Sequence, residues 1–203
     1  MGDAIFQNTS HALHVSYLVM AHEPRRSTAL WRAILVMMEG QKNLNSMQRA
    51  WMDRLRGIGR GSVDFDGLTG DEIRAQCAMV TQAVRDHLPI PERAIILCKF
   101  GIQLDKAQGV ADLATYIKPL LNFTDDIAIK ALVYGHLKPG QRQKGFSYEE
   151  ISKSQGISVK ALRIAAGHIA RVAATLEQLA IDRLSPMFLR DGLIATRDER
   201  IAA

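Results

Sequence analysis

The chain has 203 residues, enough for one or two domains with a hydrophobic core. Hydrophobic residues make up 47% and charged residues 23%, which is typical of globular proteins in water. No apolar run approaches the roughly 18 residues of a membrane span, and the first residues lack the basic start of a signal peptide. The two cysteines have no metal-ligand or disulfide pattern, so we expect a cytoplasmic protein in a reducing compartment, without membrane contact.

The positive charge is concentrated in one segment. Residues 138–171 contain seven basic and two acidic residues, which equals the net charge of +5 of the whole chain. The rest of the chain holds 19 basic and 19 acidic residues and is neutral. A local basic excess is typical of a nucleic-acid-binding surface, although it also occurs on an ordinary solvated face.

Apolar residues recur at intervals of three and four along most of the chain, which predicts an all-α helical bundle. Near the N-terminus we expect helices at about 10–21, 28–40 and 44–56. Residues 1–56 would form a helical region for oligomerisation or partner contact. Trp31 and Trp51 are better explained as anchors of these helices than as bases for nucleotide stacking.

A glycine-rich stretch follows and predicts a linker at residues 57–67. Its glycines could suggest a phosphate-binding loop. No apolar strand precedes the stretch, however, and no Lys-Ser or Lys-Thr pair follows it. We therefore interpret it as a domain boundary.

A second helical domain is expected at 68–186, with a C-terminal tail at 187–203, in which "MFLRDGLI" could pack back while "ATRDERIAA" is expected to be exposed. Thr69 and Glu72 form a capping box, in which each side chain bonds the backbone N–H of the other residue. Pro91, Glu92 and Gly101 mark the start and end of another helix. The helices predicted before the polar loop at 136–144 are at about 71–87, 91–100, 105–121 and 124–135, the last capped by Thr124.

The stretch "GFSYEEISKSQGISVKALRIAAGHIAR" at 145–171 predicts two helices joined by a tight turn. Ser147 and Glu150 form a second capping box, Gly156 suits the corner, and Ser158 caps the next helix. That helix meets no proline until Pro186. The residues expected to lie between the two helices are Phe146, Ile151, Ile157, Leu162 and Ala165.

Two helices with this spacing and a glycine-containing turn are typical of a helix-turn-helix, placed here at 146–171. The segment 131–171 resembles the promoter-recognition region (region 4) of bacterial sigma factors and related phage-type regulators. The resemblance rests on Tyr134-Gly135, "SYEEISKSQ", "GIS" and "VKALRIAAGHIAR". It covers about a fifth of the chain.

The resemblance implies that the second helix enters the major groove of double-stranded DNA. It assigns base contacts to Ser158, Val159, Lys160, Arg163, Ile164 and His168, with Ala161 and Gly167 on the same face and Leu162 and Ala165 in the core. Backbone contacts are expected from Lys138, Arg142, Lys144, Tyr148, Lys153 and Arg171. This helix is poorer in polar residues than those of sigma factors. Val159, Ala161 and Ile164 could contact thymine methyl groups or bury against another protein.

No local pattern suggests a catalytic site, so we expect no enzyme activity and no cofactor or metal. His11 and His14 share a helix face without further ligands nearby, and Asp125-Asp126 is better explained as helix-start charge than as a catalytic pair.

The sequence thus predicts a DNA-binding transcription regulator, by analogy a phage or mobile-element factor acting with RNA polymerase, such as a late-gene antiterminator, and able to form homo-oligomers. The alternatives are a protein-interaction or assembly factor and a phage DNA-packaging subunit.

Overall fold

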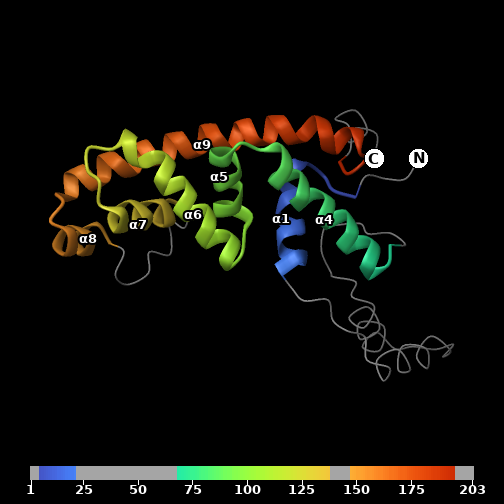
Figure 1. Ribbon diagram of the computed structural model, residues 1–203, viewed down its shortest axis with the longest axis horizontal. Coiled ribbons are helices and arrows are strands. Elements are labelled where there is room, and N and C mark those ends of the chain that lie inside the picture. Colours follow the sequence, from blue (N-terminus) through green and yellow to red (C-terminus); the bar gives the residue numbers. More distant parts are fainter. Residues whose placement is uncertain (1–4, 22–67, 138–146, 195–203) are drawn as a thin grey trace, which may run out of the picture.

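The computed structural model describes residues 5–21, 68–137 and 147–194 (Figure 1). These residues are predominantly helical and contain no strand, which confirms the predicted all-α class. The only β-type pairing among them is an isolated bridge between Phe6 and Ile194. The elements are α1 (Thr9–Ala21), α4 (Gly70–His87), α5 (Ile90–Phe100), α6 (Leu104–Ile117), a 3₁₀ turn η1 (Lys118–Leu120), α7 (Asp126–Leu137), α8 (Tyr148–Gln155) and α9 (Val159–Arg190).

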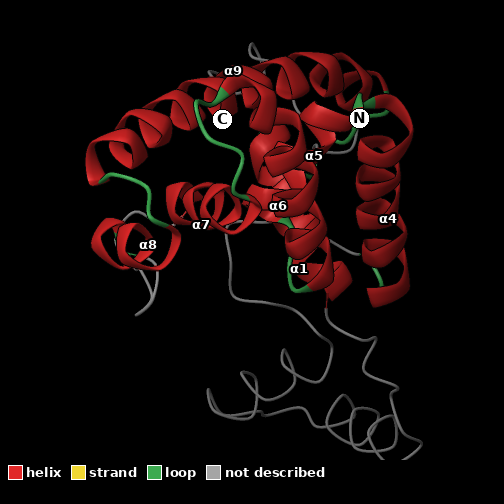
Figure 2. Cartoon of the chain, turned by 60° about the vertical axis from the view of Figure 1, so that its left-hand side comes forward, coloured by secondary structure: helices red, strands yellow, loops and turns green. Residues whose placement is uncertain are grey.

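Helix α9 is the longest of the described helices, and most of the others pack against it. Its 32 residues span about 48 Å at 1.5 Å per residue, and the other helices lie along one side of it (Figures 1 and 2). The buried positions of α9 recur every three or four residues, so they form one stripe along the helix. They are Leu162, Ala165, Ile169, Ala173, Leu176, Ala180, Leu184 and Phe188.

The buried residues of α9 belong to two hydrophobic clusters. Its first half, to Leu176, packs with α5, α6, α7 and α8. Its second half, from Ala180, packs with α1, α4 and the residues just after α9. Helix α5 contributes Ile95 and Cys98 to the first cluster and Ile96 and Leu97 to the second, because it lies between them.

Helices α5 and α6 approach each other closely at Gly109. A Cβ atom at this position would lie 2.7 Å from the backbone nitrogen of Cys98 and 2.8 Å from the carbonyl oxygen of Ala94. Glycine is therefore required by backbone contact between two helices, while the remaining interface is formed by larger side chains such as Leu113 and Ile117. Of this pair, α5 packs directly against α9, and α6 contacts α5 and α7.

The predicted helix starts are confirmed where both partners of the cap lie close in sequence. Thr69 and Glu72 form the predicted capping box of α4. Ser147 and Glu150 form that of α8. Each box satisfies two backbone N–H groups that have no partner inside their helix.

Three predicted helix ends are wrong. The expected helix 105–121 ends as α6 at Ile117 and tightens into η1, because Pro119 lacks the N–H that an α-helix needs. The expected helix 124–135 starts at Asp126 and is capped by Asp125 instead of Thr124, since Asp125 Oδ1 accepts the N–H of Ala128 at 2.6 Å. It also continues through Gly135 to Leu137.

Pro186 does not end α9, which continues to Arg190. Pro186 lies on the exposed side of the helix, and it has no N–H to donate to the carbonyl of Asp182. The residues after α9 fold back: Leu193 and Ile194 are buried, and the N–H of Phe6 donates to the carbonyl of Leu193 at 2.9 Å. The first part of the predicted tail 187–203 thus belongs to the core.

The first predicted helix, 10–21, is present as α1 and packs on α4 in the second cluster. The predicted helices at 28–40 and 44–56 and the linker at 57–67 lie outside the described residues. The proposed division at residues 57–67 therefore stays a prediction. Among the described residues, no helix combines the length and the hydropathy that crossing a bilayer requires.

Candidate functional site

Helices α8 and α9 are joined by a three-residue turn with a defined corner. Gly156 takes the left-handed conformation, with φ of 69°, and its N–H donates to the carbonyl of Ser152. A residue with a Cβ would be strained at this φ, so glycine fits the corner. Ser158 then caps α9, because its hydroxyl accepts the N–H of Ala161 at 3.2 Å. The chain passes from α8 into α9 through this short turn, and the cap starts α9 at a fixed residue.

The inner faces of α8 and α9 meet in the first hydrophobic cluster. Ile151, Leu162 and Ala165 are buried there, as predicted, and Ile157 in the turn is partly buried against them. Full burial of a leucine such as Leu162 contributes about 2 kcal/mol to folding. Phe146, the remaining predicted contact, lies outside the described residues.

The outer face of the first three turns of α9 is exposed. We call it the α9 face, and it consists of Lys160, Arg163, Ile164, Gly167 and Arg171. At 3.6 residues per turn these five positions fall within about 100° around the helix axis, so they project from the side opposite Leu162 and Ala165. Ile164 has 61% of its surface exposed although it is apolar. Neither Lys160 nor Arg171 forms an ion pair with a described residue. The face therefore combines unpaired cations with exposed apolar surface.

Arg163 has a competing partner on α8. Its Nη2 atom lies 4.0 Å from Oε1 of Glu149, and both side chains are mostly exposed. Such a solvated pair contributes less than about 1 kcal/mol to folding. It is loose enough to open when another anion approaches Arg163, but the carboxylate also repels that anion.

The other residues predicted to contact DNA differ in their solvent exposure. Ser158 and Lys153 are exposed, whereas Val159 and His168 are half-buried. Tyr148, predicted to contact a phosphate, packs partly against the first hydrophobic cluster. Lys138, Arg142 and Lys144 lie outside the described residues, so the structure places four of the seven basic residues of 138–171. All four, Lys153, Lys160, Arg163 and Arg171, are exposed.

A groove of about 270 Å³ opens along the side of α9 away from Glu149. We call it the Leu120–Ile164 groove. Its lining is Leu120, Leu121, Asn122, Phe123, Ala161, Ile164, Ala165, His168 and Arg171. The lining is mainly apolar and contains no carboxylate. Sequence reasoning missed its 120–123 wall, because that segment was assigned to the end of a helix and a loop.

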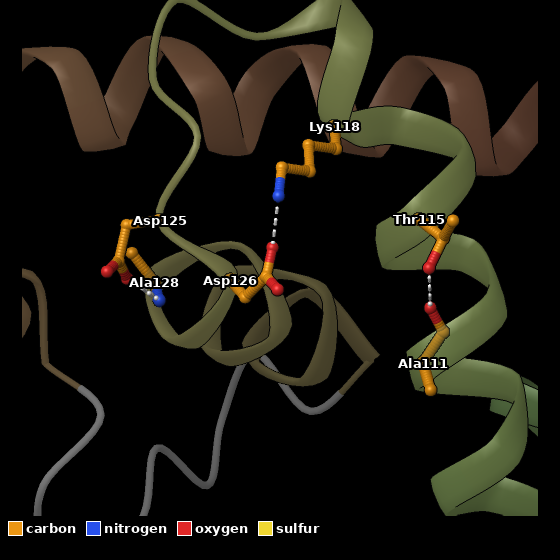
Figure 3. A network of polar contacts seen from close by, with 6 residues as sticks. All are labelled: Ala111, Thr115, Lys118, Asp125, Asp126 and Ala128. Carbon is orange, nitrogen blue, oxygen red and sulfur yellow. Dashed lines mark hydrogen bonds and ion pairs between the residues drawn. The ribbon is translucent and has the colours of Figure 1, made fainter.

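The segment that carries this wall is braced at both ends (Figure 3). Lys118 Nζ lies 2.7 Å from Asp126 Oδ1, and the hydrogen bond and the charge of Lys118 lower the pKa of the Asp126 carboxyl. Asp125 fixes the start of α7 through its bond to Ala128. Asp125 therefore caps α7 and Asp126 forms a solvated ion pair with Lys118, while Leu121 and Phe123 hold the groove wall by packing partly against the first hydrophobic cluster.

Groups that could support chemistry are scarce in the described part of the chain. There, no group of three or more His, Cys, Asp or Glu side chains could hold a metal ion. Both thiols are buried, and burial raises the pKa of Cys98 to about 12. The α9 face and the Leu120–Ile164 groove provide charge, hydrogen-bond donors and apolar surface. These properties suit the binding of a ligand or partner.

The chain matches no protein-family model and no curated protein. The resemblance of 131–171 to sigma region 4 therefore stays a prediction.

Proposed function

We propose that the chain is a DNA-binding regulator that uses α8 and α9 as a helix-turn-helix, with α9 in the major groove of double-stranded DNA. The observation that supports this most is the α9 face: three exposed cations on the first turns of a helix that follows a tight, capped turn. In this arrangement the first helix braces the second, and the N-terminal half of the second helix reaches base edges.

Each residue of the α9 face has a chemical role in this proposal. Arg163 can donate two hydrogen bonds to a guanine, a contact that provides about 1–3 kcal/mol of discrimination. Lys160 and Arg171 neutralise phosphates, and Ile164 meets a thymine methyl group. Lys153 on α8 adds a phosphate contact. The supply of hydrogen-bonding side chains is small, so backbone contacts provide most of the affinity.

Salt-dependent binding to duplex DNA tests the proposal. Lys160→Gln and Arg171→Gln should each reduce the slope of log K against log salt by about 0.9, because each removes one phosphate contact. Arg85→Gln is the matched control: Arg85 is also exposed, but it lies on α4, next to the second cluster. Equal losses in all three variants, or none, would overturn the assignment of α9.

The pair Arg163–Glu149 gives a second test with the opposite sign. Glu149→Gln removes a carboxylate next to Arg163 and should tighten duplex binding by about threefold at low salt, in line with the strength of an exposed pair. Selection from random duplexes then shows whether Arg163 and Ile164 read sequence. An enriched site supports a regulator, whereas binding without enrichment supports the packaging alternative.

A further inference from the structure

The Leu120–Ile164 groove has the properties of a docking site for a protein segment. Two apolar residues at its edge are unusually exposed, with Leu120 at 50% and Ile164 at 61%. They come from segments 44 residues apart in sequence and line the same hollow. The volume of about 270 Å³ is below that of most small-molecule sites and matches one or two side chains.

Gly167 adds an independent observation. A glycine inside a helix costs about 1 kcal/mol relative to alanine. A Cβ at this position would meet nothing within 4 Å, so no contact among the described residues explains the glycine. It lies on the α9 face between Ile164 and Arg171. A missing side chain there allows another backbone to approach α9 closely.

The charge of the lining indicates which kind of partner fits. Arg171 and His168 are its ionisable members, and Lys160 lies one turn before Ile164. A second copy of this chain docked through the same face would bring the same cations to the groove and be repelled. DNA would satisfy the cations, but its apolar surface in the groove is limited to thymine methyl groups. An acidic segment that carries a large apolar side chain satisfies both the charge and the apolar lining.

We infer that the Leu120–Ile164 groove binds an apolar anchor of a short acidic segment of a partner protein. The segment lies across Gly167, with the anchor between Leu120 and Ile164 and its carboxylates at Arg171 and Lys160. This is the helix-in-groove or extended-peptide mode of recognition, in which a few buried anchors provide most of the affinity. The site does not depend on DNA binding. If the chain also binds DNA, the two ligands share the α9 face and exclude each other.

A displayed library of random peptides of about twelve residues tests the inference against the full chain. The expected result is enrichment of peptides that combine Leu, Phe or Trp with Asp or Glu. Synthetic copies should bind about tenfold more weakly to Leu120→Ser and to Ile164→Gln, as expected when an anchor pocket is lost. Both substitutions are at exposed positions, so the fold is kept and far-UV circular dichroism checks it.

Leu104→Ser is the control, because Leu104 is 85% exposed at the opposite end of α6. It should leave peptide affinity unchanged. Absence of enriched peptides, enrichment of basic ones, or equal binding by all three variants overturns the inference. It is also overturned if Leu120→Ser weakens duplex DNA as strongly as Lys160→Gln does, since the groove then belongs to the DNA interface. Failure of duplex binding alone refutes the proposed function and leaves the peptide result standing.

Discussion

Gly109→Ala should destabilise the protein, because α6 cannot accept a Cβ at its contact with α5. The added atom would lie 2.7 Å from the backbone nitrogen of Cys98 and 2.8 Å from the Cβ of Leu97. An ordinary contact begins at 3.4 Å, so the helices must separate by about 0.7 Å. Overpacking of this kind costs about 1–3 kcal/mol, and two backbones resist here, which favours the upper end. The higher helix propensity of alanine offsets about 1 kcal/mol.

The net expectation is a loss of about 2 kcal/mol, or about 4–8 °C in Tm for a chain of this size. Chemical denaturation followed by far-UV circular dichroism measures it. Gly167→Ala is the matched control: it makes the same change in a helix where a Cβ meets nothing within 4 Å, and it should stabilise by about 1 kcal/mol. If Gly109→Ala proved as stable as the wild type, the close approach of α5 and α6 would be refuted.

Three further predictions concern strain, the ion pair of a buried glutamate and the thiols. Gln103→Gly should stabilise the fold by about 1 kcal/mol in denaturation experiments, since Gln103 has a strained φ of 48°; a loss of stability would contradict this. Arg183→Ala should cost about 2 kcal/mol, because the carboxylate of Glu92, only 5% exposed, loses its partner at 2.8 Å; unchanged stability would show the pair to be unimportant. Cys77 and Cys98 should react with a disulfide reagent at pH 8 only after unfolding, because burial raises the pKa of both thiols, and rapid labelling of the native chain would refute their burial.

The sequence by itself determined the helical class and most helix starts in the described residues. Neighbouring residues in the sequence predicted the two capping boxes and the glycine corner, and all three adopt the predicted geometry. They are Thr69 with Glu72, Ser147 with Glu150, and Gly156. The reason is that a cap or a left-handed corner involves residues within three or four positions of each other, so its partners are visible in a short stretch. Of the buried stripe of α9, the sequence identified Leu162 and Ala165.

Where long-range contacts compete with local sequence signals, the tertiary structure determined the outcome. Glu92 has the expected charge for a helix start, yet it is buried and paired with Arg183, 91 residues away. Pro186 is a helix breaker by local rules, but α9 continues past it because Phe188 and the following residues are anchored in the core. The packing of α9 outweighs the one hydrogen bond lost at Pro186. The residues that pack against α9 are distant in sequence, so local rules do not detect them.

The candidate site also combines features that the sequence predicted with features that only the tertiary structure shows. The resemblance to sigma region 4 predicted an outward face on the start of α9. Of that predicted face, Lys160, Arg163 and Ile164 are exposed, whereas Val159, Ala161 and His168 are half-buried. The groove beside that face could not be predicted, because its other wall comes from the segment of Leu120, where Leu121 and Phe123 pack against the first hydrophobic cluster. Periodicity along one helix carries no information about which segment of the chain packs next to it.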